Sequence, residues 1–243
     1  MKSKRTILLA VAAVVLIGSF FLPNMAAGFM DARRLDNLIL VEAQSISIDA
    51  APVLSLPERI ALASSPNTEV LPLATGQAMD EQTAQATAIQ EVSRFFRDDT
   101  FVFAVYECAI DNASAAFVID TQTPSANTII WEFVIYDREG TELIVTLDDQ
   151  TGMILKMIYR GTGGDAELGE DSPHMTSDEM QRTAQNLTDM MAVYYGFPVR
   201  LGDYQISAGG NIAYYRADLS GAGTVISMYG VIRATGFTMN ERV

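Results

Sequence analysis

Apolar and polar residues alternate along successive segments in the middle of the chain, the pattern of half-buried β-strands. The segments between them are short and contain Asp and Gly, which favours tight turns and antiparallel neighbours. The sequence therefore predicts a three-stranded meander. Its strands are residues 129–136, 143–147 and 153–160. The first strand has Ile129, Trp131, Phe133 and Ile135 on one side, and the second has Leu143, Val145 and Leu147 pointing inward.

Two other segments have apolar residues at spacings of three and four, the period of an amphipathic helix. Residues 78–98 carry the first apolar face, with Ala88, Ile89, Val92, Phe95 and Phe96. The second helix begins at the capping box of Thr176 and Glu179 and ends near Gly196 and Pro198. Its apolar stripe is Met180, Ala184, Leu187, Met191 and Tyr194. Each helix needs a sheet to cover its apolar face.

The rest of the chain divides at Pro and Gly residues. Residues 55–65 predict a short helix with Pro57 in its first turn, and residues 68–75 predict an edge strand because Pro72 lacks an N–H. Residues 161–173 are rich in Gly and acid without apolar periodicity, which predicts a linker. Further strands are predicted at residues 41–49, 101–110, 115–121, 199–208, 212–220 and 224–237.

These elements predict an α+β fold: an N-terminal transmembrane helix followed by two small modules, each a helix packed on its own antiparallel sheet. The predicted divisions are residues 1–30, 31–160, 161–175 and 176–243: the cytoplasmic tip with the anchor, the first module, the acidic linker and the second module. Thr83-Ala84-Gln85 recurs as Thr183-Ala184-Gln185 near the start of the second helix, which leaves a duplicated module as an open possibility.

The N-terminus carries the clearest signal for location. Residues 6–30 contain no charge and are long enough, as a helix, to cross the roughly 30 Å of a bilayer's hydrocarbon core. Lys2, Lys4 and Arg5 precede this segment, so the positive-inside rule places the body of the chain outside the cytoplasm. A retained single-pass anchor is the first interpretation, and a signal peptide cleaved after Gly28 is the alternative.

The net charge of the chain is -14, and its N-terminal tip is basic, so the body after residue 30 is more acidic still. Such a surface repels phosphate backbones, which argues against binding to nucleic acid. The single cysteine, Cys108, excludes an intramolecular disulfide and a cysteine-rich zinc site.

Few residues suggest chemistry. Asp148 and Asp149 are adjacent acids, but they stand at a predicted turn that ends with Gly152. The only histidine, His174, lies in the linker beside Pro173, and Lys156 alternates with apolar residues along a strand. The sequence predicts no catalytic residue, no cofactor-binding residue and no metal ligand. The tyrosines Tyr194, Tyr195, Tyr204, Tyr214 and Tyr215 pack under the C-terminal sheet or line a groove.

Residues 130–159 resemble a PepSY-type domain. The resemblance rests on Trp131, the turn at residues 137–140, and Asp148 or Asp149 followed by Thr151-Gly152 and an apolar run. The helix at residues 79–97 would be the packing element of such a domain. The second module shares the layout but lacks the Asp-x-Thr-Gly turn, and is similar to a cystatin-like unit. The resemblance implies a binding module, with a peptidase or a membrane sensor of the cell envelope as its partner.

Three functions follow from these patterns. The first is a non-enzymatic regulatory or protein-binding ectodomain, tethered to the cytoplasmic membrane through residues 6–30. The second is an envelope hydrolase that uses Asp148 and Asp149. The third is an extracytoplasmic protein that binds a ligand in a groove between the modules.

Overall fold

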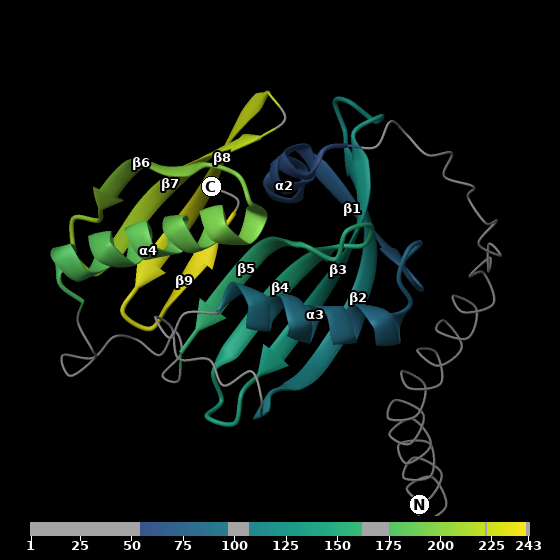
Figure 1. Cartoon of the computed structure of the whole chain (residues 1–243), viewed down its shortest axis with the longest axis horizontal. Coiled ribbons are helices and arrows are strands. Elements are labelled where there is room, and N and C mark those ends of the chain that lie inside the picture. Colours follow the sequence, from purple (N-terminus) through teal and green to yellow (C-terminus); the bar gives the residue numbers. More distant parts are fainter. Residues whose placement is uncertain (1–53, 97–106, 162–174, 222, 242–243) are drawn as a thin grey trace, which may run out of the picture. The chain divides into compact units, whose positions relative to one another are not determined.

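The computed structural model describes residues 54–96, 107–161, 175–221 and 223–241 (Figure 1). All of them belong to one compact unit, Ala50–Val243. The predicted membrane segment 6–30, the predicted strand 41–49, His174 and nearly all of the predicted linker lie outside these residues. No helix of the described part is long and apolar enough to span a membrane.

The described residues contain three helices and nine strands. The helices are α2 (Leu56–Ser64), α3 (Glu81–Phe95) and α4 (Ser177–Tyr195). The strands are β1 (Thr68–Leu73), β2 (Ala109–Asp120), β3 (Asn127–Tyr136), β4 (Glu142–Asp148), β5 (Ile154–Arg160), β6 (Val199–Ile206), β7 (Ile212–Gly221), β8 (Thr224–Arg233) and β9 (Gly236–Met239).

The prediction of two modules with separate sheets is wrong, because all nine described strands belong to one antiparallel sheet. Its strand order is β1-β2-β3-β4-β5-β9-β8-β7-β6. Two meanders, β2 to β5 and β6 to β9, therefore meet through their last strands. Each meander follows a helix, as predicted. The two meanders differ from the prediction in being joined edge to edge in one sheet.

The join depends on β9, a strand of four residues that the sequence pattern did not predict. Residues 224–237 were expected to form one strand, but the chain turns at Ala234 and Thr235, so that Arg233 pairs with Gly236. On its other side β9 pairs with β5, from Met157 opposite Met239 to Arg160 opposite Gly236. A side chain at Gly236 would collide with the carbonyl oxygen of Tyr159, so glycine permits this close pairing.

A second correction concerns β2. The sequence predicted two strands, at residues 101–110 and 115–121, whereas β2 is one strand of 12 residues with an irregularity between Ile110 and Asn112. The polar residues that suggested a break are accommodated by this bulge. Residues 101–106 lie outside the described part.

Other predictions from the pattern are confirmed. The first short helix is α2, β1 lies at an edge of the sheet as Pro72 predicted, and β3, β4 and β5 form the expected antiparallel meander. Gly140 and Gly152 adopt positive φ at the two hairpin turns. The α4 helix begins at the capping box of Thr176 and Glu179 and ends at Gly196 in the left-handed conformation.

Helices α3 and α4 run in front of the strands of their respective meanders in Figure 1. Their apolar faces are buried as predicted. The two helices also contact each other, because the ring of Phe95 lies edge-on to the ring of Tyr194, with 5.4 Å between the centroids. The Tyr194 hydroxyl donates a hydrogen bond to Glu91 and accepts one from the backbone N–H of Ile154.

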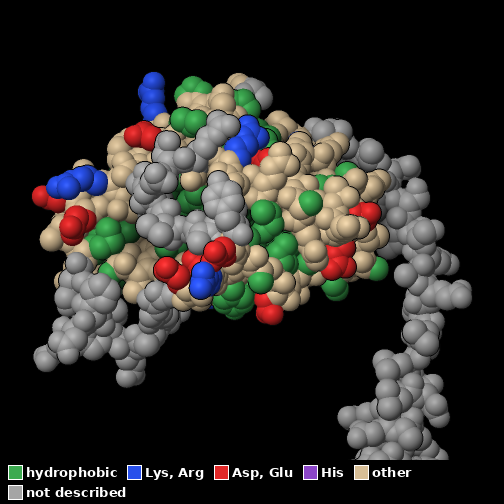
Figure 2. Space-filling model, turned by 60° about the horizontal axis from the view of Figure 1, so that its bottom comes forward, with side chains coloured by type: hydrophobic (Ala, Val, Ile, Leu, Met, Phe, Trp, Pro, Cys, Tyr) green, Lys and Arg blue, Asp and Glu red, His purple; other side chains and the backbone are tan. Residues whose placement is uncertain are grey.

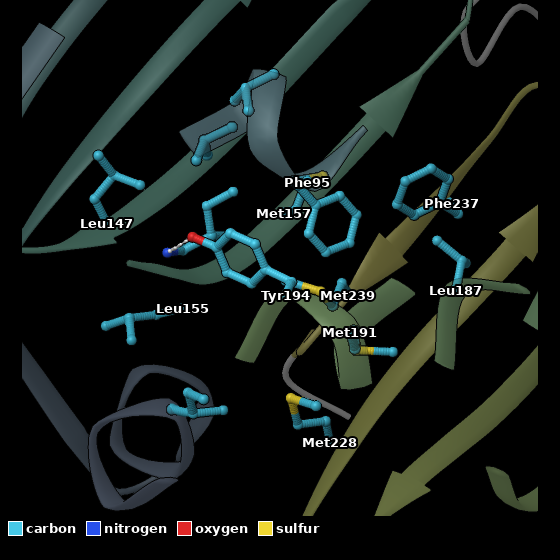
Figure 3. Close-up of a cluster of buried hydrophobic side chains, with 14 of the residues drawn as sticks. Phe95, Leu147, Leu155, Met157, Leu187, Met191, Tyr194, Met228, Phe237 and Met239 are labelled. Carbon is cyan, nitrogen blue, oxygen red and sulfur yellow. Dashed lines mark hydrogen bonds between the residues drawn. The ribbon is translucent and has the colours of Figure 1, made fainter. Parts of the chain in front are cut away.

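One hydrophobic core serves both halves of the sheet. Figure 3 shows Tyr194 of α4 surrounded by side chains of α3, β4, β5 and β9. The labelled residues come from the two meanders and both helices: Phe95, Leu147, Leu155, Met157, Leu187, Met191, Met228, Phe237 and Met239. The halves are therefore joined by packing as well as by strand pairing.

Helix α2 contacts both β5 and β8. Asn240, which directly follows β9, ties α2 to this junction through its side-chain amide. That amide donates hydrogen bonds to the carbonyl oxygens of Ile60 in α2, at 2.7 Å, and Leu155 in β5, at 2.8 Å. Asn240 is buried and has a positive φ. It fixes the end of β9 against two elements that lie far from it in sequence.

Candidate functional site

Asp149 is buried and accepts hydrogen bonds from two directions. The backbone N–H groups of Gln77, Ala78 and Met79, just before α3, donate to its carboxylate at 2.9, 2.7 and 3.2 Å. The indole N–H of Trp131 donates to it at 2.8 Å. The carboxylate therefore holds the loop before α3 against the β3–β4 part of the sheet.

Asp148 is fully buried and pairs with Arg59 of α2, at 2.9 Å between Oδ2 and Nη1. It also accepts hydrogen bonds from the hydroxyl of Thr128 and from the backbone N–H of Thr151. Arg59 reaches Gln150 of the same turn. This ion pair fastens α2 to the β4–β5 hairpin.

Asp149 thus holds the loop before α3 through neutral donors. Asp148 holds α2 through Arg59 and accepts its other bonds from neutral donors. The described residues contain no group of three or more Asp, Glu, His or Cys side chains able to hold a metal ion. The local bond from Thr151 is the turn interaction that the sequence predicted for an Asp at this position. The bonds to α2 and to residues 77–79 are long-range and were not predicted.

The remaining candidates are distributed over the molecule. Cys108 is half-buried, and burial raises the pKa of its thiol. Lys156 lies on β5 opposite Thr146. The five tyrosines do not form one groove: Tyr194, Tyr195 and Tyr215 are buried, Tyr204 is half-buried and Tyr214 is exposed.

The face of the sheet that points away from α3 and α4 carries an apolar row. Side chains of a strand alternate between faces, so the neighbours of the core residues Met157 and Phe237 point to this opposite face. Strand register then aligns residues of six strands across it: Val134 opposite Ile144, Ile144 opposite Ile158, Ile158 opposite Thr238, and Val231 opposite Tyr214. The backbone N–H of Val231 donates to the Thr238 hydroxyl, which links β8 to β9 within the row.

We call this row the cross-strand stripe; its members are Val134, Ile144, Ile158, Thr238, Val231 and Tyr214. With strands about 4.8 Å apart, it is about 24 Å long. Tyr214 is 46% exposed, and Tyr229, on the next strand and the same face, is 44% exposed. The stripe crosses the junction of the two meanders.

A polar row runs beside the stripe. It aligns Tyr136, Glu142, Arg160, Gly236 and Arg233 on consecutive strands from β3 to β8. Where this row meets the stripe, the surface has a pocket with a volume of about 50 Å³. We call this the arginine hollow, which is lined chiefly by Ile158, Arg160, Val231, Arg233, Gly236, Thr238 and Glu241.

On the side of the molecule shown in Figure 2, acidic and basic side chains are scattered among hydrophobic ones. No protein-family model, no curated protein and no solved structure matches the chain. The function is therefore inferred from the geometry of the described residues.

Sequence reasoning missed both the stripe and the hollow. The alternation of apolar and polar residues within each strand was visible in the sequence. The residues of the stripe and the hollow, however, become neighbours only when β5 pairs with β9. Arg160 ended one predicted strand, but Arg233 lay inside the predicted strand 224–237, so no local signal pointed to the hollow.

Proposed function

We propose that the chain is a non-enzymatic binding protein of the cell envelope, tethered through residues 6–30, whose partner protein lies across the cross-strand stripe. The stripe is the observation that carries the proposal. It is a row of side chains, apolar except for Thr238, that spans both meanders. Val231 and Thr238 are buried, Val134, Ile144 and Ile158 are half-buried, and Tyr214 is exposed. Apolar rows flanked by polar residues are typical of protein-binding surfaces.

The chemistry of the surface also favours binding over catalysis. The acids that an envelope hydrolase would need, Asp148 and Asp149, are occupied by bonds that support the fold. The stripe, by contrast, offers Tyr214, with Tyr229 beside it on the same face, and tyrosines are enriched where proteins bind one another. An envelope peptidase or membrane sensor is the partner class that the PepSY resemblance implies, and it forms part of this proposal.

Affinity purification of the full chain from membranes tests the proposal. We would compare Tyr214→Lys, on the stripe, with Val193→Lys, on the surface of α4, where Val193 is 78% exposed. Both variants add one positive charge at an exposed apolar side chain. We expect the same envelope protein to be recovered with the natural chain and with Val193→Lys, and to be lost with Tyr214→Lys.

Two outcomes would contradict the proposal. Equal recovery with Tyr214→Lys would remove the stripe as the binding surface. A hydrolytic activity of the purified chain that Asp149→Ala abolishes, while the variant stays folded, would favour the enzyme hypothesis instead.

A further inference from the structure

We propose that the arginine hollow binds a carboxylate group, a property beyond the protein binding assigned to the stripe. The pairing of β9 with its neighbours brings the two arginines together. Arg160 lies opposite Gly236 on one side, and Arg233 lies opposite the same glycine on the other. With strands about 4.8 Å apart, the two arginine Cα atoms are about 10 Å from each other. Gly236 places no side chain between them.

Arg160 is held in place by a chain of hydrogen bonds. Its Nη1 donates to Glu142 Oε2 at 2.6 Å, and the Tyr136 hydroxyl donates to Glu142 Oε1 at 2.9 Å. A guanidinium group has five N–H donors, and the bond to Glu142 uses one of them. The fixed position lowers the entropy that Arg160 would lose on holding a ligand. Its planar array of donors matches the two oxygens of a carboxylate.

The charge and size of the hollow favour a carboxylate on a short apolar chain. The chain as a whole has 30 acidic and 16 basic residues, yet the hollow is lined by two arginines and one acid, Glu241; Glu142, the partner of Arg160, lies outside the lining. Ile158 and Val231 supply apolar walls beside the guanidinium groups. A volume of about 50 Å³ exceeds what a single water needs, so the hollow has room for a small polar group such as a carboxylate.

The carboxylate has two possible sources, a free short-chain acid or the C-terminus of a peptide. Both can be titrated into the full chain in detergent while backbone amide shifts are followed by NMR. The probes are propionate, the peptide Gly-Val-Val with a free C-terminus, the same peptide with an amidated C-terminus, and inorganic phosphate. We expect saturable shifts at Gly236, Thr238 and Val231 with propionate, with the free-acid peptide or with both, and none with the amidated peptide.

Matched arginine variants show whether the binding is local. Arg233→Gln removes one guanidinium from the hollow, whereas Arg200→Gln makes the same charge change on β6, at the far edge of the sheet. Loss of a hydrogen bond to a charged group weakens binding about tenfold or more. We expect that loss with Arg233→Gln and unchanged affinity with Arg200→Gln.

The source follows from the probe that saturates: propionate indicates a free acid, and the free-acid peptide alone indicates a chain terminus. No saturable shift with either carboxylate would overturn the proposal. Equal weakening by both arginine variants would also overturn it, because it would reveal only a general charge effect. Tighter binding of phosphate than of either carboxylate would contradict the assigned ligand class.

Discussion

Asp149 shows how a single buried acid can support distant parts of a fold. Its carboxylate accepts from three backbone N–H groups and from the Trp131 indole. The sequence correctly placed this residue at a turn beside Gly152. It could not identify residues 77–79 as donors, because no local pattern connects them to a turn about 70 residues later in the chain.

Replacement of Asp149 by Ala should destabilise the protein by about 3 kcal/mol, because it leaves several buried donors without an acceptor. Urea denaturation followed by circular dichroism measures the change. The control is Asp189→Ala on the exposed side of α4, where the carboxylate accepts only from Gln185 among the described contacts. We expect a cost there of about 0.5 kcal/mol or less. Similar costs for both variants would show that the Asp149 contacts contribute little.

Gly152 is required by its surroundings as well as by its backbone. It has a φ of +72°, and an added Cβ would lie 2.7 Å from the methyl group of Thr87 in α3. Gly140 at the neighbouring hairpin has a φ of +83° but open space around it. Gly140→Ala should therefore cost about 1 kcal/mol, for the left-handed backbone alone.

Gly152→Ala should cost more than Gly140→Ala, by about 1 to 3 kcal/mol, and Gly152→Val should destabilise the body further. Urea midpoints of the variants measure this. Thr87→Ser removes the obstructing methyl group, so Gly152→Ala should be less costly in that background. A Gly152→Val protein of full stability would contradict the assigned hairpin and its contact with α3.

At the scale of elements, the sequence predicted most helices and strands because their patterns are local. The apolar faces of α3 and α4, the capping box at Thr176 and the meander from β3 to β5 all follow from spacing within one segment. Strand β9 was missed because Ala234 and Thr235 are not typical turn residues, so residues 224–237 look continuous. Strand β9 has only four residues, so its own apolar alternation gave little further indication of the turn before it.

The pairing of β9 can be tested at Gly236, whose added methyl group would collide with the Tyr159 carbonyl oxygen. Gly236→Ala should weaken the pairing with β5 and expose amides of both strands. Hydrogen exchange should then be faster in β5 and β9, by about tenfold or more, than in β3. Gly209→Ala is the control, since its methyl group would meet only the Asn211 side chain, at 3.2 Å. Unchanged exchange in Gly236→Ala would contradict the close β5–β9 contact.

At the scale of the whole molecule, the candidate site is a product of the join between the meanders. Ile158 and Arg160 belong to the first meander, and Val231 and Arg233 belong to the second. Each meander alone has half of the stripe and one arginine of the hollow. The sequence predicted the inward and outward faces within each half, but the site exists only after β5 and β9 pair. The join also places buried tyrosines in the core that the two halves share.

Those buried tyrosines should make the stability of the whole protein sensitive to alkaline pH. Burial raises the pKa of Tyr194, Tyr195 and Tyr215 well above its ordinary value. In the unfolded chain these phenols lose their protons near about pH 10, whereas the folded protein retains them. The stabilisation is therefore complete below that pH and is lost as the pH rises above it. Each tyrosine should contribute a fall of about 1.4 kcal/mol per pH unit.

Adjacent residues of β7 provide a matched pair for this test, because Tyr215 is 3% exposed and Tyr214 is 46% exposed. Urea midpoints between about pH 9 and about pH 11 give the slope of stability against pH. Averaged over this range, Tyr215→Phe should reduce the slope by about 0.7 kcal/mol per pH unit, because one retained proton is removed and the unfolded phenol is half ionised near about pH 10. Tyr214→Phe is the control for removing a phenol hydroxyl from the exposed neighbour on the same strand. Equal slopes for the natural chain and Tyr215→Phe would show that Tyr215 ionises as readily in the folded protein as in the unfolded chain.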